Sequence, residues 1–176
     1  ELELAAWRID EARARYERIA HGDPCAAAFG RLSLCCELSG DLHRADRLLA
    51  RASELDPEEW PRVPRLSAAE FESVLDEAVA RLPAAFRAAL DDVQILVESV
   101  PGRELIDLSD PSATPPDLLG LFTGSSLLER SSESAFEIPP TVHLFQRNLE
   151  RAARDHEELV DEIAKTLYHE LGHALG

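Results

Sequence analysis

The stretch from Thr166 to Gly176 reads TLYHELGHALG and places His169 and His173 four residues apart. Four residues turn an α-helix slightly more than once, so the two imidazoles project only about 40° apart and can reach one ion from the same side. Glu170 lies a further step around the helix. In the H-E-x-x-H arrangement, two neutral imidazoles hold Zn²⁺ and the glutamate takes a proton from water. The pattern predicts a zinc site with His169 and His173 as ligands and Glu170 as general base; surface histidines are the alternative.

The same stretch closes a helix that is predicted to begin at Asp155, where Asp155 and Glu158 have the spacing of a capping box. Gly172 inside this helix costs about 1 kcal/mol relative to alanine, so we expect something to approach the backbone closely there. Gly176 suits a left-handed turn that would end the helix. The apolar ridge leaves both histidines off the core face and consists of Leu159, Val160, Ile163, Ala164, Leu167 and Leu171.

Upstream of this helix, helical signals are followed by strand signals and an irregular proline-rich stretch, which predicts an α+β unit over residues 67–176. Ser67 and Glu70 form a capping box at the start of its first helix, and Pro83 interrupts that helix. Alternating and β-branched residues predict strands at 93–99, 119–124 and 141–146, with a weaker strand at 135–138.

Residues 1–60 are expected to form a separate helical domain, followed by a linker at 61–66 that contains Pro61 and Pro64. The segment AFGRLSLCCELSGDLHRADRLLARASELDP, residues 28–57, resembles a tetratricopeptide repeat, and residues 1–57 resemble about one and a half such units. An unrelated helical hairpin is the alternative, because Ser33 and Cys36 replace the usual glycine and tyrosine. The resemblance implies a possible protein partner at these helices.

Composition limits the class of protein. The formal net charge of −16 argues against nucleic acid as a partner, since binding a polyanion needs a basic face. No apolar run reaches the roughly 20 residues of a membrane span, and no signal peptide is recognisable, so we expect a cytoplasmic protein and no membrane partner. The chain has no methionine, which indicates a trimmed part of a longer product. The three cysteines are expected to be reduced thiols packed as small apolar residues.

The stretch HELGHALG is similar to the H-E-x-x-H-x-x-G motif of zincin metallopeptidases, and residues 67–176 resemble the small single-domain bacterial zincins called minimal matrix-metalloprotease-like. The resemblance implies a mixed sheet packed on an active-site helix and a peptide or protein substrate. It also implies the roles given above for the two histidines and Glu170. A third ligand, usually Asp or His, would follow Gly176 by about three residues. The other matching segments are FESVLDEAVARLPAAFRAALDDVQILVES, LLGLFTGSSLLERS and IPPTVHLFQRNLERAA.

Several nearby residues have two interpretations each. His143 is a strand-face residue or a group that stabilises an oxyanion, and Tyr168 is a core residue or a catalytic one. Thr166 and Glu162 either orient an imidazole or lie on a solvated helix face. The weak strand at 135–138, with Phe136, is the candidate edge for pairing with an extended peptide.

Two functions from different classes remain open. The first is a zinc-dependent peptidase that uses Glu170 as general base. The second is a protein-interaction module, in which the helical repeats bind a partner and the zincin-like unit is regulatory or catalytically silent. Digestion of a peptide library with and without a chelator separates the two.

Overall fold

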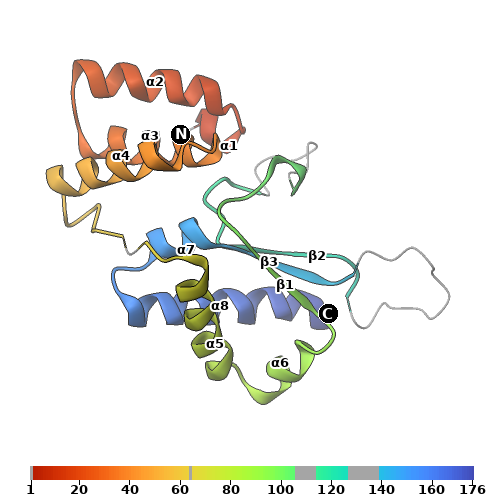
Figure 1. The fold of residues 1–176 in the computed structure, drawn as a ribbon. Helices are drawn as coiled ribbons and strands as arrows, with labels where there is room; N and C mark the ends of the chain where they lie inside the picture. The colour runs from red at the N-terminus through yellow and green to blue at the C-terminus, as the bar shows by residue number, and fades with distance from the viewer. Residues whose placement is uncertain (1, 64, 106–113, 127–138) are drawn as a thin grey trace. The chain divides into compact units, whose positions relative to one another are not determined.

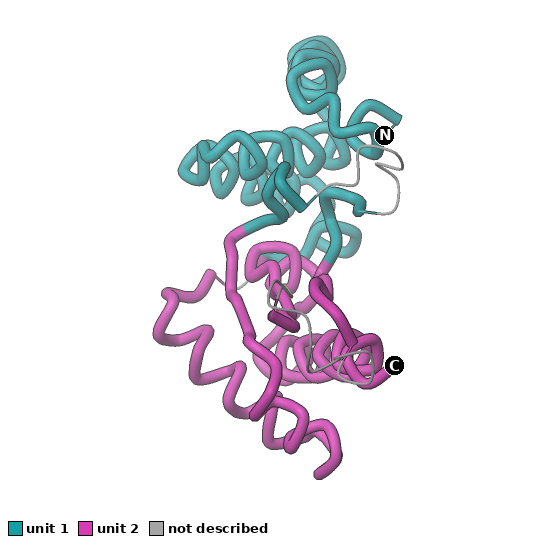
Figure 2. Tube along the Cα trace, turned by 90° about the vertical axis from the view of Figure 1, so that its right-hand side faces the viewer, with its two compact units in different colours: residues 1–62, 100–118 teal, residues 63–99, 119–176 magenta. Residues whose placement is uncertain are grey.

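The computed structural model of the chain describes residues 2–63, 65–105, 114–126 and 139–176. Two compact units divide it, one of residues 1–62 with 100–118 and one of residues 63–99 with 119–176 (Figure 2). The first unit is helical, whereas the second combines helices with a three-stranded sheet (Figure 1). The expected α+β class, with a small mixed sheet, is confirmed.

The first unit contains helices α1 (Leu2–Ala5), α2 (Ile9–Gly22), α3 (Ala26–Leu38) and α4 (Leu42–Leu55), and the short 3-10 helix η1 (Arg103–Leu105). Between α3 and α4 the chain turns at Gly40, whose φ of 79° is the left-handed conformation that glycine adopts without strain. Asp41 then caps α4 by accepting a hydrogen bond from the Arg44 backbone N–H.

Small residues allow α3 and α4 to pack closely. Ala45 and Ala52 are fully buried, and the buried Ser33 hydroxyl donates to the Ala45 carbonyl at 2.8 Å. Ser33 thus replaces the expected glycine and still satisfies its own polar group. The assignment of these helices to tetratricopeptide repeats stays a prediction.

The cysteines depart partly from expectation. Cys35 and Cys36 are buried free thiols, and burial raises the pKa of Cys35 to about 12. Cys25 is also a free thiol but is exposed, at the position just before the first residue of α3. The expectation that all three pack as apolar residues is therefore wrong for Cys25.

Residues 100–118 belong to the first unit, although the sequence analysis assigns them to the second domain. One long-range contact within that unit is a hydrogen bond in which the indole Nε1 of the buried Trp7 donates to the Thr114 carbonyl at 2.7 Å. A buried indole N–H requires an acceptor, and a segment 107 residues away along the chain supplies it.

The second unit contains helices α5 (Ala68–Arg81), α6 (Ala84–Ala89), α7 (Gln146–Ala152) and α8 (His156–Leu175). Ser67 and Glu70 form the predicted capping box at the start of α5, and the bonds from Ser67 lower the pKa of the Glu70 carboxyl. Asp155 caps α8 as predicted by accepting from the Glu158 backbone N–H. The Glu158 carboxylate, however, accepts from Arg154 rather than from Asp155, so the second capping box is only half formed.

The sheet consists of β1 (Gln94–Glu98), β2 (Gly120–Thr123) and β3 (Thr141–Phe145), in the order β1-β3-β2. β1 runs parallel to β3, and β2 runs antiparallel to it. All three were expected from the sequence within one or two residues. The weaker strand expected at 135–138 lies outside the described residues.

The core of the second unit lies between one face of the sheet and helices α5 and α8. Val142 and Leu144 of β3 pack in one buried cluster with the predicted ridge of α8, including Ile163, Leu167 and Leu171. This ridge is confirmed, because its largest members are fully buried. It fixes α8 against the sheet (Figure 1). His169 and His173 are exposed and lie off this buried ridge.

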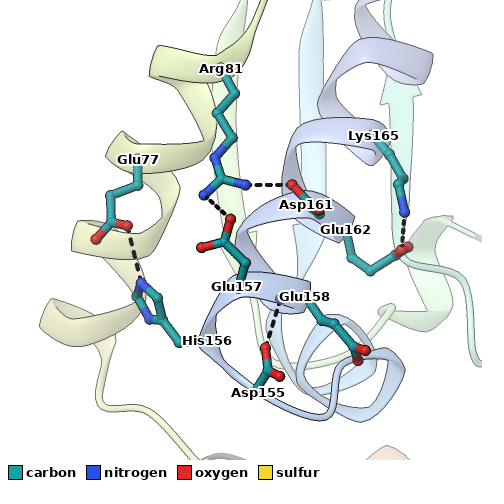
Figure 3. Close-up of polar contacts among 9 residues, drawn as sticks. All are labelled: Glu77, Arg81, Asp155, His156, Glu157, Glu158, Asp161, Glu162 and Lys165. Atoms are coloured by element: carbon teal, nitrogen blue, oxygen red, sulfur yellow. Dashed lines mark hydrogen bonds and ion pairs between the residues drawn. The ribbon is translucent and has the colours of Figure 1, made fainter.

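Ion pairs on the surface of the second unit join α5 to α8 (Figure 3). Arg81 of α5 reaches both Glu157 and Asp161 of α8, and His156, for which the sequence suggests no partner, contacts Glu77 at 3.1 Å. These side chains are mostly exposed, so water screens the pairs and they contribute little to stability. No helix among the described residues is long and apolar enough to cross a membrane.

Candidate metal centre

His169 and His173 lie one turn apart on the exposed side of α8. Their rings are nearly perpendicular, at 86°, with centroids 4.9 Å apart. Their Nε2 atoms face each other at 3.4 Å. A direct hydrogen bond between nitrogens at that distance is long and weak. A weak hydrogen bond therefore does not account well for the close approach of the two Nε2 atoms.

A shared metal ion fits this geometry. A tetrahedral zinc ion with Zn–N bonds of about 2.0–2.1 Å holds two imidazole nitrogens about 3.3 Å apart. The observed separation is 3.4 Å. Neutral imidazole nitrogens are also the usual ligand chemistry for zinc. The residues present could therefore hold zinc as two of its ligands.

Glu170 lies on a different side of α8 from the histidine pair and is buried, with 8% of its surface exposed. Its carboxylate oxygen Oε2 accepts a hydrogen bond from the backbone N–H of Phe122 in β2 at 2.8 Å. The sequence analysis missed this partner, which lies 48 residues away along the chain. The sequence predicted a strand at 119–124, but no pattern in the sequence indicated that the edge of this strand contacts Glu170.

Gly120 is a second feature of β2 that the sequence analysis missed. A Cβ atom at this position would lie 2.5 Å from Thr166 Cγ2 and 3.4 Å from Glu170 Cγ. Only glycine therefore lets β2 approach α8 this closely. The helix that carries the candidate site is held against the backbone of β2 just below Glu170.

Residues 90–176 match the family model for a zincin-like metallopeptidase. The matched region contains β1, β2, β3, α7 and α8, and thus every element that positions the histidine pair and Glu170. A search of curated proteins found no match. The family match supports a zinc-peptidase fold for this region. Helix α5 precedes the match, although the resemblance read from the sequence begins at Ser67.

Within the zincin-like region, His143 lies on the face of β3 opposite to the core residues Val142 and Leu144. Its Nδ1 contacts Glu98 Oε2 of β1 at 2.7 Å, and its Nε2 contacts Thr123 Oγ1 of β2 at 3.1 Å. Both ring nitrogens are engaged, so His143 acts as a strand-face residue that links three strands. The alternative role in stabilising an oxyanion has no support in this geometry.

Three other residues of α8 near the motif, Tyr168, Thr166 and Glu162, each contact residues outside the histidine pair. Of the two interpretations of Tyr168, the core residue is wrong, because the side chain is 51% exposed and its ring lies against Phe86 of α6 with centroids 4.3 Å apart. The catalytic interpretation stays a prediction. Thr166 is buried beneath Gly120, and Glu162 accepts from Lys165 at 2.6 Å. A role for Thr166 or Glu162 in orienting an imidazole stays a prediction.

The two glycines of the zincin-like motif differ from each other. Gly176 has a φ of 99°, which agrees with the left-handed conformation predicted at the helix end. Gly172 was expected at a close approach of another segment, but an added Cβ there would meet no described atom within 4 Å. That expectation is wrong for the described chain, because Gly172 lies on the exposed side of α8.

Proposed function

We propose that this chain is a zinc-dependent peptidase that hydrolyses peptide bonds in a peptide or protein substrate. The single observation that carries this proposal is the 3.4 Å separation of His169 Nε2 and His173 Nε2, which suits two ligands of one zinc ion. The family match of residues 90–176 supports the same class of reaction.

Zinc, when bound there, would supply a positive charge that polarises the substrate carbonyl and lowers the pKa of water. In this proposal Glu170 acts as the general base, which takes a proton from the attacking water. Glu170 then returns that proton to the leaving amine. The burial of Glu170 supports this role, because a carboxylate shielded from bulk solvent is held in a defined place.

An extended peptide substrate would pair with an edge strand near the site. The expected edge strand at 135–138, with Phe136, lies outside the described residues. Pairing of the substrate with that segment therefore stays a prediction.

Digestion of a peptide library with and without a chelator tests the proposal, and Glu170→Gln tests the role of the base. We expect cleavage by the chain that a chelator stops. Glu170→Gln should retain zinc, because the ligands are unchanged, and should lose cleavage by about 10²-fold or more. Full turnover by Glu170→Gln would contradict the role of this residue.

A third zinc ligand completes the proposal. Among the described residues no group of three or more His, Cys, Asp or Glu side chains could hold a metal ion. The resemblance to zincins implies a third ligand, Asp or less often His or Glu, about three residues after Gly176, and this ligand stays a prediction. Elemental analysis should find tighter zinc in a longer form than in this chain. Equally tight zinc in both forms would assign the third ligand to a residue of this chain or of a neighbouring molecule.

The interaction-module function is the second candidate, and a groove in the first unit favours it. Apolar residues Phe29, Leu32 and Leu48 line this groove together with the ion pair between Glu17 and Arg44. A protein partner bound there would be retained in the presence of a chelator. If the peptide library stays uncleaved with zinc present, this function is favoured over the peptidase.

A further inference from the structure

The backbone N–H of Phe122 points away from the rest of the sheet. In an antiparallel pair, residues alternate between those whose N–H and C=O face the partner strand and those whose groups face outward. The Leu119 carbonyl accepts from Phe145 N–H at 3.0 Å, so Leu119 faces β3. Leu121, two residues on, faces β3 as well, and Phe122 faces outward. The outward N–H would have no partner in the sheet, and it donates to Glu170 instead.

This hydrogen bond fixes one of the two oxygens of the carboxylate. A glutamate side chain rotates about three single bonds, so a carboxylate without partners samples many positions. Here Oε2 is held at 2.8 Å by a backbone group of a sheet, which is among the least mobile donors that a protein offers. Gly120 permits the approach, because any side chain there would collide with Thr166 and crowd Glu170 Cγ. Two backbone features of β2 therefore set the position of Glu170.

We propose that the Phe122 N–H is a positioning group of the peptidase reaction, which holds Glu170 Oε2 so that Oε1 faces the attacking water. This inference rests on the proposed function. The group acts through Glu170 and touches neither substrate nor metal. Misplacement of a catalytic group by about 1 Å can reduce the rate by about 10²-fold, so loss of this hydrogen bond should be measurable.

The contact itself can be tested in the full chain without metal or substrate. The exchange rate of the Phe122 amide proton, measured by NMR, should be slow in the wild type. It should remain slow in Glu170→Gln, because the carboxamide oxygen still accepts the bond, and should rise by about tenfold or more in Glu170→Ala. Equal exchange rates in the wild type and Glu170→Ala would overturn the proposal.

The effect on the reaction needs a variant that removes the Phe122 N–H and keeps the aromatic side chain. Replacement of Phe122 by phenyllactate, its α-hydroxy analogue, converts the amide to an ester and keeps the ring. The matched control carries phenylalanine inserted by the same method. Against a peptide cleaved in the library digestion, kcat should fall by about tenfold or more while KM changes by less than about twofold. Zinc content, read by elemental analysis, should not change.

Three other results of this experiment would contradict the proposal. An unchanged kcat would overturn the positioning role and leave the hydrogen bond as a contact that only fastens β2 to α8. Loss of zinc would also overturn it, because the N–H would then support the ligands rather than the base. If the control cleaves no peptide, the proposed function fails and the positioning role fails with it, whatever the exchange rates.

A second pair of variants tests the same N–H if the ester-containing protein folds poorly. Phe122→Pro removes both the N–H and the aromatic ring, and Phe122→Ala removes the ring but keeps the N–H. Proline is tolerated at this position because its missing N–H faces away from β3. We expect kcat of Phe122→Pro to be about tenfold or more below that of Phe122→Ala. Equal values would overturn the proposal.

Discussion

At the scale of single residues, the histidine pair depends only on helix geometry. His169 and His173 are four residues apart on one helix, so their nitrogens converge without help from any other element. The separation of 3.4 Å is too long for a good hydrogen bond and close to that of two zinc ligands. The pair is exposed, so forming it costs little desolvation. A metal can therefore reach both imidazoles without rearrangement of the core.

Gly172 lies between the two histidines, and we predict that Gly172→Ala stabilises the chain. An added Cβ would meet no described atom within 4 Å, so the change should gain helix propensity without a clash. The expected increase in the free energy of unfolding is about 1 kcal/mol, measured by urea denaturation of the metal-free chain. A decrease of similar size would show that another segment does approach this position.

At the scale of elements, the spacing between β2 and α8 controls the site. We predict that Gly120→Ala lowers the free energy of unfolding by about 1–3 kcal/mol, because the new Cβ would lie 2.5 Å from Thr166 Cγ2 and 3.1 Å from the His143 carbonyl oxygen. Thermal or urea denaturation measures the loss. The variant should also weaken the hold on Glu170, since the two elements must move apart.

A double variant provides the control for this prediction. Thr166→Ser removes the Cγ2 atom that the new Cβ would meet, so Gly120→Ala should cost less in the Thr166→Ser background than in the wild type. The remaining cost reflects the His143 carbonyl oxygen, which belongs to the backbone of β3 and cannot move aside. Additive costs would mean that β2 and α8 separate enough to avoid Thr166 altogether.

At the scale of the whole molecule, the first residues of the second unit bind a buried carboxylate, that of Glu150. Glu150 of α7 is 1% exposed and accepts from Arg65 Nη1 at 2.7 Å, from the Leu66 backbone N–H at 3.1 Å and from Gln146 Nε2 at 2.8 Å. Two of these three partners lie in the predicted linker, residues 61–66. This part of the linker therefore satisfies a charge inside the second unit.

We predict that a fragment beginning at Ser67 is less stable than one beginning at Val63. The shorter fragment leaves Glu150 without Arg65 and Leu66, and a buried carboxylate that loses its partners costs about 3 kcal/mol. Urea denaturation of both fragments measures the difference. Glu150→Gln in each fragment is the control, because a neutral side chain should reduce the difference. Equal stability of the two unsubstituted fragments would show that water replaces the lost partners.

Local features were predictable because they depend on neighbours within one or two turns of the chain. The apolar ridge of α8, the cap at Asp155, the three described strands and the histidine spacing all followed from the order of residues alone. On α8, the core interpretation of Tyr168 and the close approach expected at Gly172 were wrong, and both errors concerned which side of the helix other segments cover. Helical spacing gives the angle between side chains but not the identity of what lies opposite them.

The amino-acid sequence by itself determined the α8 helix, its exposed histidine pair and the resemblance to zincins. Only the tertiary structure decided that β3 lies between β1 and β2, that Phe122 N–H meets Glu170 and that residues 100–118 belong to the first unit, in which Trp7 donates to Thr114. These contacts join residues 48 and 107 positions apart. They form because packing of the apolar ridge against the sheet, and burial of the indole, leave each polar group with one partner within reach.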